Sequence, residues 1–213
     1  MPVLEFAILH LLSPTSTTPQ PLPSELRTNL RRHHDIQSEA SKHPVIHLRQ
    51  LEDPKILYVI GMWDSVEAHA THIQGKANQE LVESMKEQVD LANMVYFHLD
   101  VESAADVWKG LPLNAPAISI NRHNVKPGKR EEFKATFDEV KHLLEEYTQP
   151  RGILGGWRIE KETPEKDEWV LFSGFDSVDH RFGFAKTEVF ERYRAIAQFC
   201  EGFALKHATQ FEP

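Results

Sequence analysis

The chain has 213 residues, of which 40% are hydrophobic and 26% charged, and its formal net charge at pH 7 is −8. This composition is ordinary for a globular protein, and an acidic chain without a clustered basic footprint argues against a nucleic-acid partner. No apolar run is long enough to span a membrane, and the one cysteine, Cys200, excludes an internal disulfide, so we expect a cytoplasmic protein.

The first half is expected to read strand, helix, strand, strand, helix, strand. A Pro-, Ser- and Thr-rich excursion at residues 13–23 separates the first strand from a helix that Ser24 can cap. Ser65 can cap the second helix, and Gly75 predicts a break within it because glycine lowers helix stability. The predicted strands cover about residues 3–11, 45–51, 56–63 and 94–100, and the predicted helices about residues 24–41 and 65–89.

The second half is expected to repeat this order after a linker at residues 101–116. Pro127-Gly128 predicts a turn before its first helix, and Ser177 can cap its second helix, which is expected to be broken. The predicted strands cover about residues 117–125, 153–161, 168–175 and 204–211, and the predicted helices about residues 129–147 and 177–201.

The two halves share a short sequence. Trp63-Asp64-Ser65-Val66-Glu67-Ala68-His69 returns as Phe175-Asp176-Ser177-Val178-Asp179-His180, an offset of 112 residues from Asp64 to Asp176. The same offset also aligns the first apolar runs, with Phe6 on Ile118 and Ile8 on Ile120. We therefore predict one duplicated module, with copies at residues 1–100 and 117–213.

The apolar patterns predict how the copies pack. Residues 56–62 and 170–175 are apolar at nearly every position, as expected for strands that are buried on both faces. Each copy has the βαββαβ order of a ferredoxin-like module, whose helices cover only one sheet face. The predicted fold is therefore α+β, with two tandem ferredoxin-like modules packed sheet to sheet as an intramolecular dimeric α+β barrel. A barrel closed within one chain predicts a monomer or a weak homodimer.

The residues after the third strand, Trp63-Asp64-Ser65-Val66-Glu67-Ala68-His69-Ala70-Thr71-His72, resemble the antibiotic biosynthesis monooxygenase family of dimeric α+β barrels, here in a tandem two-repeat form. The resemblance implies that His72 is a helix histidine facing the cavity; the second half has Phe184 there, and Phe175 in place of Trp63. Similar proteins include cofactor-independent monooxygenases of phenolic polyketides, haem-degrading monooxygenases, cyclases, decarboxylases, isomerases and stress-responsive proteins.

The candidate catalytic residues are His69 and His72, which lie three residues apart and so share one face of a helix. A histidine can act as a general base near neutral pH, and the alternative is one solvated and one structural histidine. Two helix histidines without a third ligand at a diagnostic spacing predict no metal site; a haem with one axial histidine is the alternative implied by the resemblance. The candidate substrate-binding residues, which could equally be strand ends or core, are Trp63, His10, Asn121, His98, Tyr96, His123, Trp157 and Phe172.

The function predicted from these residues is a small-molecule tailoring enzyme, in particular a monooxygenase without an organic cofactor. A phenol or enol deprotonated by His72 becomes an electron-rich anion that can reduce molecular oxygen directly. Its substrate would be aromatic or polyketide-like. The same anion could instead attack a carbonyl group within the substrate or lose a carboxyl group. A cyclase or decarboxylase that uses the same pocket is therefore an alternative function. The non-enzymatic alternative is a stress-responsive α/β-barrel protein whose cavity is filled by side chains.

Overall fold

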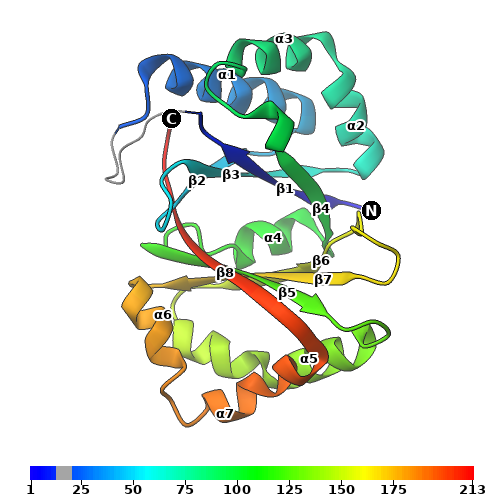
Figure 1. Ribbon diagram of the computed structural model, residues 1–213, viewed down its shortest axis with the longest axis vertical. Coiled ribbons are helices and arrows are strands. Elements are labelled where there is room, and N and C mark those ends of the chain that lie inside the picture. The colour runs from blue at the N-terminus through cyan, green and yellow to red at the C-terminus, as the bar shows by residue number, and fades with distance from the viewer. Residues whose placement is uncertain (13–20) are drawn as a thin grey trace. The chain divides into compact units, whose positions relative to one another are not determined.

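Residues 1–12 and 21–213 are described by the computed structural model of the chain (Figure 1), so the expected excursion at residues 13–23 lies largely outside them. The chain divides into two units, the first formed by Met1–Ala104 with Gln210–Pro213 and the second by Ala105–Thr209. Each unit combines helices with antiparallel strands, as expected for an α+β protein. Among the described residues, no helix is long and apolar enough to cross a membrane.

The sheet of the first unit has the strand order β4-β1-β3-β2, and its described pairings are antiparallel. Helices α1, α2 and α3 cover one face of this sheet (Figure 1). The elements are β1 (Val3–His10), α1 (Ser24–Ser41), β2 (Ile46–Gln50), β3 (Ile56–Trp63), α2 (Val66–Gln74), α3 (Lys76–Met85), a 3-10 turn (Leu91–Asn93) and β4 (Val95–Asp100).

Three residues in this unit were predicted to cap or to break a helix. Two of these predictions are confirmed, and one is wrong. The Ser65 hydroxyl accepts a hydrogen bond from the amide of Ala68 and caps α2. Gly75 separates α2 from α3, where the break was predicted. The prediction for Ser24 was wrong, because α1 follows Pro23 without a side-chain cap and Ser24 is already its first residue.

The helix-facing side of this sheet packs against α1 and α3. Ala7 and Leu9 of β1 and Val59 of β3 belong to one buried cluster with Leu26 and Leu30 of α1. Because side chains alternate along a strand, the odd-numbered residues of β1 face the helices and the even-numbered residues face away. Position 5 of β1 therefore points toward the helices.

The sheet of the second unit has the order β8-β5-β7-β6, also antiparallel. The segment expected as a linker contains a helix, β6 ends four residues before the predicted Lys161, and β8 begins four residues before the predicted Ala204. The elements are α4 (Ala104–Gly110), β5 (Ala117–Val125), α5 (Arg130–Thr148), β6 (Ile153–Trp157), β7 (Asp167–Phe175), α6 (Val178–Phe184), α7 (Phe190–Tyr193), a 3-10 turn (Arg194–Phe199) and β8 (Cys200–Gln210).

The strand pairings correct the alignment of the two halves. Val3 pairs with Trp63 in the first unit, and Ala117 pairs with Phe175 in the second. Since Trp63 and Phe175 occupy the same position of the repeat, Val3 corresponds to Ala117, and the first strands align two residues away from the predicted register. Phe6 therefore corresponds to Ile120 and not to Ile118. A shift of two residues keeps every side chain on its predicted sheet face.

The space between sheet and helices in the second unit is filled by large apolar side chains. Phe133 of α5 packs 5.6 Å from Trp157 and 6.2 Å from Trp169, measured between ring centroids. Phe184 of α6 lies 5.1 Å from Tyr193 in the same buried cluster. Aromatic rings of this size close the layer that the first unit leaves partly open.

Candidate functional site

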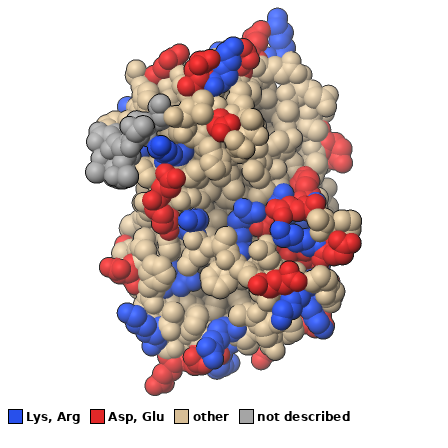
Figure 2. Space-filling model, viewed as in Figure 1, with Lys and Arg blue, Asp and Glu red and all other residues tan. Residues whose placement is uncertain are grey.

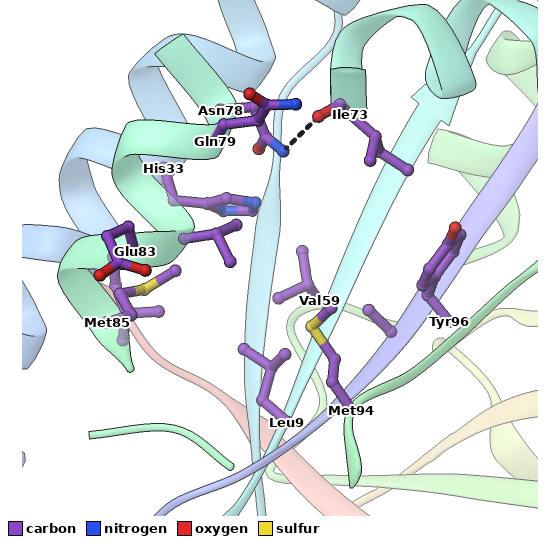
Figure 3. A pocket seen from close by; sticks show the side chains of 13 residues that line it. Leu9, His33, Val59, Ile73, Asn78, Gln79, Glu83, Met85, Met94 and Tyr96 are labelled. Carbon is purple, nitrogen blue, oxygen red and sulfur yellow. Dashed lines mark hydrogen bonds between the residues drawn. The ribbon is translucent and has the colours of Figure 1, made fainter. Parts of the chain in front are cut away.

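A cavity of about 370 Å³ lies in the first unit, between the sheet and helices α1 and α3 (Figure 3). Its walls are mainly aliphatic, with thioethers from Met85 and Met94. Its volume is at the lower end of the range for pockets that hold small organic ligands, which is about 300–1,000 Å³. The lining residues are Ala7, Leu9, Leu30, His33, Val59, Ile73, Asn78, Gln79, Val82, Glu83, Met85, Met94 and Tyr96.

His33 is the histidine that borders this cavity, and its ring extends from α1 toward it (Figure 3). Burial, followed by the charges of His72 and His34, lowers the pKa of His33 to about 4. The buried Nδ1 atom has no hydrogen-bond partner among the described residues. His33 is therefore a neutral imidazole at pH 7 and can accept a hydrogen bond or a proton from a molecule in the cavity.

Polar groups lie at the ends of the cavity. Asn78 donates a hydrogen bond of 3.3 Å from Nδ2 to the carbonyl of Ile73 and is nearly buried (Figure 3). Tyr96 is 45% exposed, and Glu83 is exposed. A ligand in the cavity would thus contact apolar walls along most of its surface and meet polar groups at its edges.

His69, one of the predicted catalytic pair, is buried beside the cavity in a stack of rings. Its ring lies parallel to Trp63, with centroids 4.6 Å apart and planes inclined by 17°. Its Nδ1 lies 2.8 Å from Nε2 of His98 on β4, and its Nε2 lies 3.5 Å from Oε2 of Glu5 on β1. Burial, followed by the charges of His98 and His72, lowers the pKa of His69 to about 3, so the ring is neutral at pH 7.

Glu5 is a carboxyl group on the helix-facing side of β1, only 4% exposed. Its Oε2 accepts hydrogen bonds from Gln37 Nε2 at 2.6 Å and Trp63 Nε1 at 2.8 Å. Burial raises the pKa of Glu5 to about 7, although both hydrogen bonds act to lower it. Gly61, opposite Glu5 in β3, leaves room for the carboxyl, since a Cβ there would lie 2.8 Å from Oε2.

His72, the predicted base, is half-buried with its ring centroid 4.9 Å from that of Trp63 and 6.4 Å from that of His69. It lines two grooves at the α1 and α2 surface, of about 430 and 230 Å³, and is absent from the lining of the apolar cavity. Burial lowers its pKa. The structure therefore places His33, and not His72, in contact with the cavity.

The other predicted site residues are divided between the units. Trp63, His69, His72, Tyr96 and His98 come together in the first unit; the ring centroid of Tyr96 lies 5.8 Å from that of His69. His10, at the end of β1, faces away from the helices by strand alternation.

Four of the predicted residues, Asn121, His123, Trp157 and Phe172, belong to the second unit. His123 is buried 5.6 Å from Phe133, and burial lowers its pKa to about 4. Trp157 packs against Trp169 at 5.0 Å. Phe172 points to the opposite sheet face from Trp169, by alternation along β7. None of these four residues belongs to the lining of the cavity in the first unit.

Sequence reasoning missed His33, Gln37 and Glu5, although each leaves a signal. His33 and Gln37 continue the stripe of Leu26 and Leu30 at helical spacing, which marks the buried face of α1. Glu5 is the one acidic residue among the apolar residues of β1. A carboxyl group in such a strand is buried, and titratable groups perturbed by burial are candidates for a functional site.

The residues present do not suit a haem. His33 could supply a neutral axial ligand, but the cavity lining contains no lysine or arginine to neutralise two propionates, and Glu83 would repel them. In the described ranges, no group of three or more His, Cys, Asp or Glu side chains is arranged to hold a metal ion.

No protein-family model and no curated protein sequence matches the chain. Solved structures do: an "anthrone oxidase-like protein" has a TM-score of 0.65 at 10% identity, covering 99% of this chain and 91% of that chain. A "putative monooxygenase" from Lactobacillus acidophilus NCFM has a TM-score of 0.63 at 13% identity, covering 98% and 93%. A chlorite dismutase variant from Candidatus Nitrospira defluvii has 0.54 at 8%, covering 98% and 91%. These likenesses show that the chain shares the fold of these structures.

Proposed function

We propose that the protein is an oxidoreductase that oxygenates a small aromatic or polyketide-like substrate with molecular oxygen, without an organic cofactor. The observation that carries this proposal is the apolar cavity of the first unit, with the neutral ring of His33 at its wall. The names of the similar structures, anthrone oxidase-like protein and putative monooxygenase, agree with this chemistry.

We propose further that the chain is the tandem form of this fold. Each half has the order strand, helix, strand, strand, helix, strand, with short helices added, which is the ferredoxin-like arrangement. The repeated Ser65 and Ser177 caps support a duplication, because both serines accept a hydrogen bond from the third residue after them.

The cavity lining indicates the substrate's charge. Apolar walls and two methionines favour a flat aromatic molecule, since thioethers pack well on aromatic rings. The lining has no basic side chain other than neutral His33, and it includes Glu83, so a carboxylate would be disfavoured. A neutral polycyclic phenol or its keto tautomer, with the acidic position toward His33, fits best. On the face seen in Figure 2, basic and acidic side chains are interspersed, without a basic patch to collect anions.

The reaction can be written for a CH2 group between two aromatic rings. His33 takes one C–H proton, and attraction to the adjacent carbanion stabilises the imidazolium that forms. The carbanion passes one electron to oxygen, and the two radicals combine to a peroxide anion, which takes the proton back from His33. Loss of the second C–H proton with cleavage of the O–O bond gives a ketone and hydroxide, which becomes water on protonation.

The test is oxygen uptake with a panel of anthrones and polyhydroxylated aromatics in the presence of a chelator. The His33→Gln variant keeps the size of the side chain but loses the base, and general-base catalysis typically contributes about 10²–10⁴-fold. We expect a loss of that size in kcat. His142→Gln, an exposed histidine of the second unit, is the matched control and should keep native activity. His72→Gln tests the base predicted from the sequence.

The outcomes separate the rival functions. Oxygen uptake that persists with the chelator and falls in His33→Gln supports the proposal. A loss of the same size in His72→Gln, with native uptake in His33→Gln, would instead identify His72 as the base. Turnover of the substrate without oxygen consumption identifies a cyclase or decarboxylase. No binding or turnover across the panel refutes an enzyme of this class and supports the scaffold alternative.

A further inference from the structure

Three titratable side chains form a line behind the cavity. Oε2 of Glu5 lies 3.5 Å from Nε2 of His69, and Nδ1 of His69 lies 2.8 Å from Nε2 of His98. All three are at most 4% exposed. They come from three elements, β1, α2 and β4, and Glu5 and His98 are direct partners across paired strands. Both ring nitrogens of His69 therefore face another titratable group.

This line has two arrangements of its protons. In one, His98 donates from Nε2 to His69, and His69 donates from Nε2 to an ionised Glu5. In the other, Glu5 is protonated and faces a bare Nε2 of His69, which donates from Nδ1 to His98. The second arrangement holds one proton more than the first, and this proton enters or leaves at the Nδ1 atom of His98. Each imidazole is neutral in both arrangements. One proton can thus move along the line without creating a buried imidazolium ion, which burial would penalise.

We propose that Glu5, His69 and His98 form a proton relay, in which a proton moves between the Glu5 carboxyl and the outer nitrogen of His98 through both rings. His98 lies two residues from Tyr96 on the same side of β4, and Tyr96 lines the cavity. The ring centroid of His98 lies 6.5 Å from that of Tyr96. Trp63 and Gln37 hold the carboxyl, and stacking on Trp63 fixes the plane of His69.

The role of the relay in catalysis rests on the proposed function. Oxidation of a CH2 group to a ketone releases two C–H protons in turn, and His33 returns the first to the peroxide anion before the second leaves. The relay takes up the second C–H proton, stores it on Glu5 and returns it to the hydroxide to form water, so protons balance. The titratable groups that face the relay are His33 from α1, His72 from α2 and Tyr96 from β4.

The relay can be tested without turnover, by infrared and ¹⁵N NMR titration of the full chain. We expect a protonated-carboxyl band that disappears with a midpoint near pH 7, and that is missing in Glu5→Gln. The ¹⁵N shifts of His69 should switch the protonated nitrogen from Nδ1 to Nε2 with the same midpoint. A carboxyl that titrates while His69 keeps one tautomer would overturn the relay, as would a Glu5 already ionised at pH 5.

A variant pair tests the outer end of the relay. His98→Phe should leave the carboxyl band but uncouple it from His69, and it should move the midpoint by about one pH unit or more. His207→Phe changes the corresponding residue of the second unit, where Ser119 and not a carboxyl is the strand partner, and should leave the band unchanged. If His98→Phe does not fold, the NMR titration of the native chain decides alone. Because these spectra need no substrate, a failed oxygen assay refutes the proposed function and leaves the relay standing.

Discussion

The buried carboxyl of Glu5 predicts a specific dependence of stability on pH. Its pKa rises from 4.5 to about 7 in the folded chain, mainly because burial disfavours the charged form. Between these values the folded state binds one proton more than the unfolded state, so its contribution to stability is full below pH 4.5 and is lost as pH rises through 7. At 1.36 kcal/mol per pKa unit, the loss amounts to about 3 kcal/mol.

Glu5→Gln removes this dependence while keeping a carbonyl oxygen for Gln37 and Trp63. Between pH 4.5 and pH 9, the free energy of unfolding measured by urea titration should rise by about 3 kcal/mol in the variant relative to the native chain, because only the native chain loses stability over this range. Any constant effect of the substitution cancels in the comparison between pH values. A difference between the two proteins that is the same at pH 4.5 and pH 9 would refute the assignment of Glu5 as a neutral buried acid.

Three further substitutions test the surrounding structure. Gly61→Ala should destabilise the chain by about 1–3 kcal/mol, since the new Cβ would lie 2.8 Å from the Glu5 carboxyl; Gly202→Ala, where a Cβ meets nothing within 4 Å, should have little effect in the same melts. Burial lowers the pKa of His47 to about 3, so below pH 6.5 the folded state binds fewer protons than the unfolded state and becomes less stable. Urea titrations of His47→Gln should therefore show about 3 kcal/mol less loss of stability between pH 7 and pH 4 than those of the native chain. Ser65→Ala should cost about 1 kcal/mol in thermal unfolding through the lost cap.

The elements of the fold were largely predictable because their signals are local. The strands at 56–63 and 117–125 and the helix at 24–41 have the predicted bounds, since hydrophobic periodicity and turn residues determine them. The helix α4 was missed because its segment reads as a polar linker between the halves. The register between the halves was misplaced by two residues, because an alternating apolar strand offers the same pattern at every second position.

The site was less predictable because it depends on contacts between distant segments. His69 and His98 lie 29 residues apart and meet through a single hydrogen bond of 2.8 Å. The separation of these two residues in the sequence does not predict that they are in contact. His33 was overlooked since basic neighbours dominate its local sequence, whereas the helical stripe that buries it is apparent only when α1 is drawn as a helix.

The corrected register indicates why the chemistry is expected in the first unit alone. Glu5 pairs with His98, and Ser119 pairs with His207, so these pairs occupy the same place in their units. The second unit thus keeps an imidazole but has a hydroxyl where the first has a carboxyl. At the position of His69 it has Arg181, which cannot pass a proton because its guanidinium stays charged near neutral pH.

Neighbouring positions also differ between the two units. Phe184 stands where the first unit has His72, and it packs 4.9 Å from Tyr147 within the buried aromatic cluster. Such a core is densely packed and adds stability through apolar burial, whereas the first unit keeps an open cavity and a buried carboxyl that costs stability above pH 7. Under the duplication and the relay proposed above, one copy can be optimised for stability while the other retains groups that are unfavourable for folding but useful for proton transfer.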